Sequence, residues 1–299
     1  MDLKLQNVVA DLHAHGWCGQ EEGNGQFILR WLGETGRRDL ATLCEYGFLY
    51  RPEQLSEEWE NTLIGIVSFG DTRYEKVVNT RGRLGRGLEV YDDHKKRFVG
   101  VHNTHGKWCF VLRGQEIPTD HGHVLILGGD KNIPRQYEKL NDVLKFARDI
   151  GAIIIADHPT AEKGIAGKIF SYLTNNGKPL SLNEPDLEIY CDMFDGIEVG
   201  NSNVTELTET NIELAKRLGL KTYASSDSHT LSQLFNGTTR FSEIDFSSWE
   251  RARNGLLVPG KIHIGPNRKY ENFLHGVSVL YNIARQKIGV VEMPEIIIE

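Results

Sequence analysis

The sequence has few cysteines, no long apolar run and no excess of positive charge. Its four cysteines lie far apart and form no CxxC pair, which argues against a zinc ribbon or a disulfide framework and favours reduced thiols in a cytoplasmic protein. No apolar run approaches the ~20 residues needed to span a bilayer, and we expect no secretory signal and no membrane association. The net charge of -7 argues against a broad nucleic-acid-binding surface.

The remaining composition is that of a globular protein, with 39% hydrophobic and 25% charged residues in 299. Apolar runs predict buried strands at 8–12, 63–69, 109–112, 124–127, 152–156, 196–199 and 222–224. Helical periodicity covers 137–150 and 205–218, and Gly219 stands where a helix commonly ends. Alternating strands and helices predict an α/β fold with a mostly parallel sheet, open or closed as a barrel, whose chemistry gathers at the carboxyl ends of the strands.

Residues 71–107 fit this alternation badly, because they are polar and rich in glycine and charge. The short apolar runs 88–91 and 97–101 flank a polar stretch, which predicts a β-hairpin on a long insertion. A disordered loop is the alternative. The arginines Arg81, Arg83 and Arg86 lie in this segment and are either a solvated surface or part of a mobile lid that binds phosphate.

The sequence DLHAH follows the first apolar run and places His13 two residues before His15. If the strand continues that far, both imidazoles lie on the same side of the backbone at its carboxyl end. Two histidines in this arrangement can bind one divalent ion. The alternative is a pair of unrelated surface histidines.

Further candidate ligands stand at other predicted strand ends. Glu116 follows the strand 109–112, and a carboxylate there can bridge two metal ions, although an isolated glutamate is more often a surface residue. His123 opens the next strand, with His121 as an alternative two residues earlier. His158 follows the strand 152–156, and Pro159 after it favours an extended backbone for His158.

The last strand end carries Asp227 and His229, again two residues apart. Taken singly, Asp227 could cap a helix and His158 could be a core histidine. Together, ionisable residues at four strand ends in a chain with 11 histidines indicate a metal site. Its mixture of carboxylate and imidazole suits Zn, Mn or Fe better than Ca or Mg.

Five segments in order resemble the polymerase and histidinol phosphatase (PHP) family: DLHAH, GQEIPTDHGHVLILG, IIIADHP, FDGIEVGNS and YASSDSH. The resemblance runs from the first strand to about Thr230, and residues 231–299 are similar to the C-terminal portion of the family. It implies one domain over 1–299 with a distorted (βα)7 barrel, on which 231–299 packs. It also implies two or three divalent ions and hydrolysis of phosphate esters.

The resemblance further implies a role for each candidate ligand. His13, His15 and Asp227 would bind the first ion, Glu116 would bridge, His123 and His158 would bind the second, and His229 the third. The family commonly has Thr-Asp-His after its second strand, whereas this chain has Asp71-Thr72-Arg73. A two-ion site is therefore as compatible with the sequence as a three-ion site.

The expected chemistry is attack on phosphorus by a metal-activated water between two ions ~3.5–4 Å apart. Asp157, His229 or a metal-bound water could protonate the leaving group; we favour His229, and Asp157 could instead orient a ligand histidine. We expect Arg73 and Arg240 to bind substrate phosphate. The insertion 71–107, with Arg81, Arg83 and Arg86, is expected to fold over the metal end.

The substrate expected from these features is a phosphorylated small molecule or a nucleotide. Two other functions stay open. One is a PHP-type nuclease acting on DNA or RNA, which the arginines between residues 81 and 97 favour together with Tyr74, Tyr91 and Trp108. The second is a non-catalytic metal-binding or partner-binding module, which the missing histidine of the Thr-Asp-His motif favours. The sequence predicts no particular oligomeric state.

Overall fold

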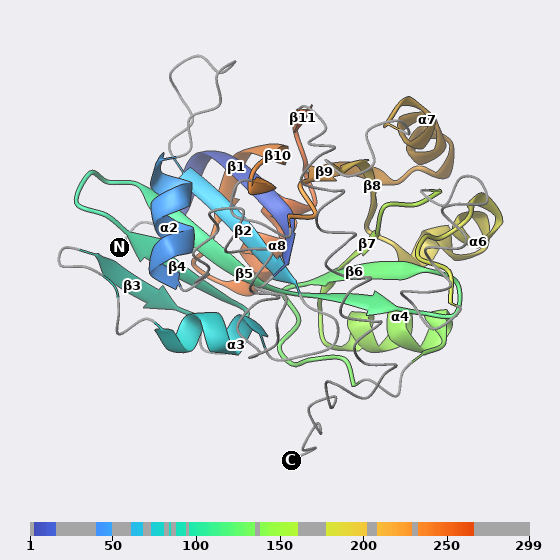
Figure 1. Cartoon of the computed structure of the whole chain (residues 1–299), viewed down its shortest axis with the longest axis horizontal. Coiled ribbons are helices and arrows are strands. Elements are labelled where there is room, and N and C mark those ends of the chain that lie inside the picture. Colours follow the sequence, from blue (N-terminus) through green and yellow to red (C-terminus); the bar gives the residue numbers. More distant parts are fainter. Residues whose placement is uncertain are drawn as a thin grey trace, which may run out of the picture.

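The computed structural model describes residues 3–15, 40–49, 61–67, 73–80, 84, 88–93, 96–134, 138–160, 178–201, 208–228 and 233–265. Its centre is one mixed sheet (Figure 1), in which nine strands follow one another in the order β11-β10-β1-β2-β5-β6-β7-β8-β9. Their bounds are β1 Lys4–His15, β2 Asn61–Val67, β5 Trp108–Pro118, β6 His123–Leu127, β7 Ile153–Ala156, β8 Gly196–Asn201, β9 Lys221–Ser225, β10 Gly237–Asp245 and β11 Ile262–Ile264.

The strand directions form two parallel blocks separated by one reversed strand. β1, β2 and β5 are parallel, and so are β7, β8 and β9, but β6 is antiparallel to both of its neighbours. The turn from β5 to β6 is too short for a crossover helix, so the two strands form a hairpin. The predicted α/β class is confirmed, whereas the (βα)7 description stays a prediction because strand and helix do not alternate between β5 and β7.

The sheet curls into a nearly closed barrel, and its seam lies where β9 meets β1 and β10. Ala14 and Ser228 form an isolated parallel bridge, and the His15 N–H donates to the Ser228 carbonyl at 3.0 Å. On the other side, the Thr239 hydroxyl oxygen accepts from the Ala224 N–H at 2.8 Å and lies 2.9 Å from the Ala224 carbonyl oxygen, to which it donates. These bonds replace the continuous ladder that a fully closed barrel would have.

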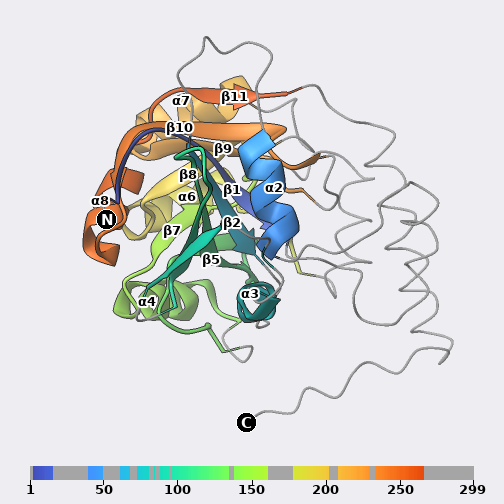
Figure 2. The same ribbon diagram turned by 90° about the vertical axis from the view of Figure 1, so that its left-hand side faces the viewer.

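Helices surround this sheet (Figure 2). They are α2 Leu40–Leu49, α3 Arg73–Val78, α4 Leu140–Asp149, α6 Glu184–Tyr190, α7 Thr208–Leu218 and α8 Trp249–Leu256, with a 3₁₀ turn at Cys191–Met193. α4 buries Leu140, Val143, Leu144 and Ala147, the helical spacing that the sequence showed. Among the described helices, none is long and apolar enough to cross a membrane.

The predicted hairpin is present as β3 Glu89–Asp92 and β4 Phe98–His102, which pair antiparallel. β4 in turn pairs antiparallel with residues 108–112 of β5, so it lies beside the amino-terminal half of that strand. Glu116 is at the other end of β5. The apolar Phe98 of the hairpin packs into the barrel core. The expected position of the insertion over the metal end stays a prediction, because Arg81, Arg83 and Arg86 lie outside the described structure.

Candidate metal centre

The inward faces of three neighbouring strands change from apolar to ionisable at one end of the barrel. Side chains two or four residues apart in a strand share a face. Each ionisable residue here lies two or four residues along the chain from an inward-facing core residue, so it faces inward too. The pairs are Leu112 and Glu116 on β5, Leu125 and His123 on β6, and Ile155 and Asp157 at the end of β7. Because β6 runs antiparallel, its first residue lies at the same end as the last residues of β5 and β7.

A β-bulge places the two histidines of β1 on this inward face. Asp11 pairs with Ile64 and Ala14 pairs with Ile66, so β1 has one extra residue between these positions. A bulge reverses the alternation of side chains. His13 and His15 consequently lie together, with ring centroids 5.1 Å apart, as the sequence predicted on the simpler assumption of a regular strand.

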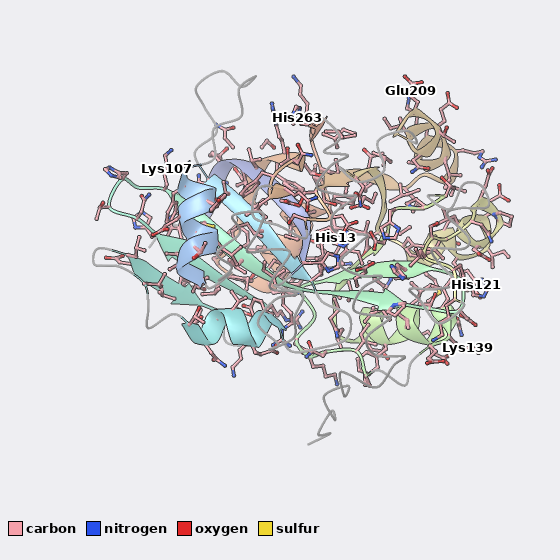
Figure 3. All side chains as sticks on the ribbon, viewed as in Figure 1. His13, Lys107, His121, Lys139, Glu209 and His263 are labelled. Carbon is pink, nitrogen blue, oxygen red and sulfur yellow. The ribbon has the colours of Figure 1, made fainter. Side chains whose placement is uncertain are left out.

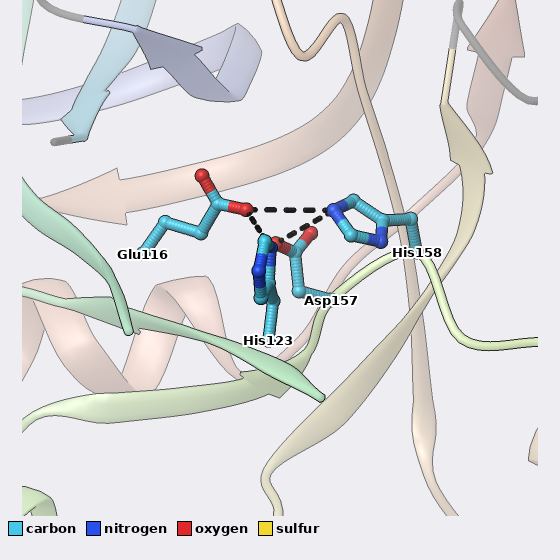
Figure 4. A group of neighbouring side chains, drawn as sticks. All are labelled: Glu116, His123, Asp157 and His158. Atoms are coloured by element: carbon cyan, nitrogen blue, oxygen red, sulfur yellow. Dashed lines mark hydrogen bonds and ion pairs between the residues drawn. The ribbon is translucent and has the colours of Figure 1, made fainter. Parts of the chain in front are cut away.

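Glu116 stands between two pairs of histidines. Its Oε2 lies 3.3 Å from Nε2 of His15 and 3.7 Å from Nε2 of His13. Its Oε1 lies 3.5 Å from Nε2 of His158 and contacts Nδ1 of His123, as Figure 4 shows. Each carboxylate oxygen thus faces a different histidine pair, which is the arrangement that a bridge between two ions requires.

Two aspartates complete the surroundings of these rings. Asp227 Oδ1 lies 3.0 Å from Nε2 of His15 and 3.6 Å from Nε2 of His13. Asp157 reaches two rings, with Oδ1 at 3.1 Å from Nδ1 of His13 and Oδ2 at 3.3 Å from Nε2 of His158. Each aspartate therefore lies at ion-pair distance from two histidines, and Glu116 from four.

The backbone is strained at two of these residues. His158 has φ of 23° and Asp227 has φ of 49°, in the left-handed region that non-glycine residues rarely adopt. The extended backbone that we expected for His158 before Pro159 is therefore wrong. The reason is a tertiary contact, because the His158 N–H donates to Oε2 of Glu198 at 3.0 Å and holds the turn.

The buried polar atoms of this cluster fit a divalent ion. Both ring nitrogens of His13, Oε2 of Glu116 and both carboxylate oxygens of Asp157 are buried without a hydrogen bond within the described structure, although they face one another at short distance. Burying polar atoms in this state is costly unless something binds them. Three groups of side chains could hold an ion: His13, His15 and Glu116; Glu116, His123, Asp157 and His158; and His13, Asp157 and Glu198.

The charges of the cluster also attract cations. Burial alone would lower the pKa of His13, but the Asp157 and Asp227 carboxylates raise it well above its usual value. Burial likewise opposes protonation of His158, and Asp157 and Glu116 nevertheless raise its pKa to about 10. Burial raises the pKa of Asp157 to about 8. Without metal the cluster therefore holds protons, and a divalent ion would replace them.

Comparisons with known proteins support this fold. No family model and no curated protein matches the chain. Among solved structures, PsfC from Pseudomonas syringae PB-5123 is similar, with a TM-score of 0.51, 16% identity, and coverage of 95% of this chain and 100% of PsfC. The likeness to PsfC shows a shared fold over nearly the whole chain.

A second solved structure is a two-domain protein from Bacteroides vulgatus ATCC 8482, described as containing a predicted PHP-like metal-dependent phosphoesterase. It has a TM-score of 0.49 and 13% identity, and the match covers 87% of this chain and 65% of that protein. The chain thus spans slightly less than two thirds of that two-domain protein.

Two buried carboxylates of the site were not among the predicted residues. Glu198 lies in β8, and Asp11 precedes the two histidines of β1. Asp11 accepts hydrogen bonds from the Ser226 N–H at 3.0 Å, the Ser226 hydroxyl at 2.5 Å and the Phe235 N–H at 2.8 Å, while burial raises its pKa to about 6. The signal for both was an acidic residue inside an apolar strand run.

Other predicted residues lie elsewhere. His121 pairs with Asp186 at 2.8 Å, far from His13 (Figure 3), so His123 is the histidine beside Glu116. Arg240 pairs with Val9 in the sheet, four residues before His13 and thus ~13 Å along β1. Four predicted residues and one side chain lie outside the described structure, namely His229, Arg81, Arg83, Arg86 and the side chain of Arg73.

Removal of divalent ions is expected to lower the thermal stability of the protein. A ligand that binds only the folded state stabilises it by ~2.7 kcal/mol at 100 times its Kd, and here it would also separate mutually repelling carboxylates. Melting curves of the full chain with excess Mn²⁺ and after chelation and dialysis would measure the shift, expected to be several degrees. Identical melting temperatures in the two states would contradict a bound ion.

Proposed function

We propose that this protein is a metal-dependent phosphoesterase of the PHP type, with a small phosphomonoester or a nucleotide as substrate. The observation that carries the proposal is the position of Glu116, whose two oxygens face separate pairs of buried histidines. A single ion needs only one such group. A bridging carboxylate is typical of two-ion sites that act on phosphate esters.

The residues fall into two sets on this proposal. His13, His15 and Asp227 would hold one ion, and His123 and His158 the other, with Glu116 shared. Bound divalent ions would supply Lewis-acid charge at the phosphoryl group and a nucleophilic water at neutral pH. Zn, Mn and Fe are the candidates that fit the donor atoms.

Asp157 is better suited to positioning than to proton donation. Its side chain is fully buried between Nδ1 of His13 and Nε2 of His158, so it holds both rings and has no exposed edge for a leaving group. Protonation of the leaving group therefore stays assigned to His229 in the proposal. The proposal also keeps a set of arginines as the residues that bind the substrate phosphate, namely Arg73, Arg81, Arg83, Arg86 and Arg240.

A hydrolysis screen tests the proposed function. We expect the full chain, loaded with Mn²⁺ or Zn²⁺, to release phosphate from phosphomonoesters or nucleotides, to lose this activity on chelation and to regain it when the ion returns. Preferential cleavage of single-stranded oligonucleotides would instead indicate the nuclease. Binding of Mn²⁺ without hydrolysis of any of these classes would contradict an enzymatic role and favour a metal-binding module.

A further inference from the structure

Glu198 is a buried carboxylate in the middle of β8, between the apolar residues Ile197 and Val199. Its neighbours Ile197 and Val199 belong to the core between β8 and the outer helices, so Glu198 points to the opposite, inward face. Only 1% of its surface is exposed. Burying a carboxylate is costly unless partners compensate it, so the contacts of Glu198 indicate why this position is acidic.

These contacts join β8 to the carboxyl ends of three other strands. Oε2 of Glu198 accepts hydrogen bonds from the His158 N–H at 3.0 Å and from Nδ2 of Asn201 at 3.2 Å. Oε1 accepts the Ser225 hydroxyl and lies 3.5 Å from Nδ1 of His13. The carboxylate thus connects β8 with the turn after β7, the end of β9 and the carboxyl-terminal part of β1.

The bond to His158 acts on the strained turn. A non-glycine residue in the left-handed region is strained and persists only where the surroundings hold it. Here the N–H of the strained residue itself donates to Glu198. Without that acceptor, the turn could relax and carry the His158 imidazole away from Glu116.

The contact with His13 acts on the ring. Its Nδ1 faces two carboxylates, Asp157 at 3.1 Å and Glu198 at 3.5 Å, whereas its Nε2 faces Glu116 and Asp227. The carboxylates at Nδ1 are the nearer pair, which favours the proton on Nδ1. Nε2 then offers its lone pair to the side where the ion would lie.

We propose that Glu198 is a positioning residue of the metal centre, which holds the His158 turn in place and orients His13 so that Nε2 is its ligand atom. This role rests on the proposed function, because it presumes an ion beside Glu116. Both oxygens of Glu198 already accept hydrogen bonds, so in this role it acts through His13 and His158 and is not itself a ligand of the ion.

Glu198→Gln separates the two contacts. The two N–H donors at Oε2 require an acceptor, so the glutamine oxygen should take that place and its NH₂ group should replace Oε1. The Ser225 hydroxyl can turn to accept, but Nδ1 of His13 then faces a donor. We expect Mn²⁺ affinity, measured by isothermal titration calorimetry on the full chain, to fall ~10–100-fold, as for other groups that orient metal ligands.

Glu198→Ala tests the hydrogen bond from the His158 N–H without any metal. Loss of the acceptor should raise the hydrogen-exchange rate of the His158 amide by at least ~10-fold, because an unpaired amide exchanges through local opening. If this variant does not fold, the Mn²⁺ affinity of Glu198→Gln alone tests the proposed role of Glu198.

Asp195→Asn is the matched control. Asp195 stands three residues before Glu198 and also accepts a backbone hydrogen bond, from the Ile154 N–H at 2.9 Å, along with bonds from Arg148 and Arg253. Its substitution should lower stability but leave the Mn²⁺ affinity unchanged. The hydrogen-exchange rate of the His158 amide, relative to other amides of the same variant, should also stay unchanged.

The outcomes distinguish this role from the proposed function. Wild-type Mn²⁺ affinity in folded Glu198→Gln would overturn the role, as would an equal loss in Asp195→Asn. A wild-type chain that binds Mn²⁺ but hydrolyses no phosphate ester would refute only the function. A wild-type chain that binds no Mn²⁺ would refute both.

Discussion

Replacing Glu116 by glutamine is expected to reduce phosphate ester hydrolysis by at least ~100-fold, or about 2.7 kcal/mol of transition-state stabilisation. The amide has nearly the same size but no negative charge, and one of its two positions becomes a donor. One of the histidine pairs would therefore lose its shared anionic ligand. We also expect the content of bound Mn²⁺ to fall, since Glu116 faces both pairs.

The kcat and KM of the variant, together with its metal content by elemental analysis, measure this effect. Glu243→Gln is the matched control, because Glu243 lies on the exposed surface of β10 and pairs with Lys4 at 3.0 Å. It undergoes the same chemical change and should leave activity and metal content as they are. Near wild-type hydrolysis by metal-loaded Glu116→Gln would exclude a bridging role.

Replacing Gly237 by alanine is expected to destabilise the protein by at least ~3 kcal/mol, the upper range for overpacking. A Cβ at this position would lie 1.9 Å from the Ser225 carbonyl oxygen and 2.4 Å from its carbon. Both are backbone atoms of β9 and cannot move aside as a side chain could. The substitution should therefore separate β9 from β10 at the seam, and Asp227, two residues after Ser225, should be displaced with it.

Denaturant unfolding of the full chain measures this loss, and Mn²⁺ titration measures its consequence for the site. Gly106→Ala serves as a control for the generic effect of an added methyl group, since a Cβ there meets nothing within 4 Å and only its φ of 81° is unfavourable. A larger destabilisation by Gly106→Ala than by Gly237→Ala would show that the seam has room that the structure does not indicate.

Several features of this site could be predicted from local sequence, because they depend on short-range periodicity. Apolar runs that end in histidine or carboxylate marked the strand ends, and the structure brings His13, His15, Glu116, His123, His158 and Asp227 together at one end of the barrel. The hairpin was also predictable, since two apolar runs around a polar turn are a local pattern.

Other features depended on residues far apart in the chain. His121 lies before β6 and pairs with Asp186, whereas His123 is the first residue of β6 and contacts Glu116. Glu198, embedded in an apolar run, gave no indication that it would meet His158 and Ser225. The proline rule failed at His158 because a tertiary hydrogen bond outweighed a local steric preference.

By itself, the sequence determined the α/β class, the positions of most strands and the ionisable residues at their ends, since backbone geometry fixes strand period and helix period within a few residues. The strands β10 and β11 were not among those predicted. Only the tertiary structure decided the reversed direction of β6, the bulge in β1 and the closing of the seam. It also decided that the hairpin lies beside the amino-terminal half of β5. These features depend on which apolar faces pack together across long sequence separations, and local patterns do not encode that choice.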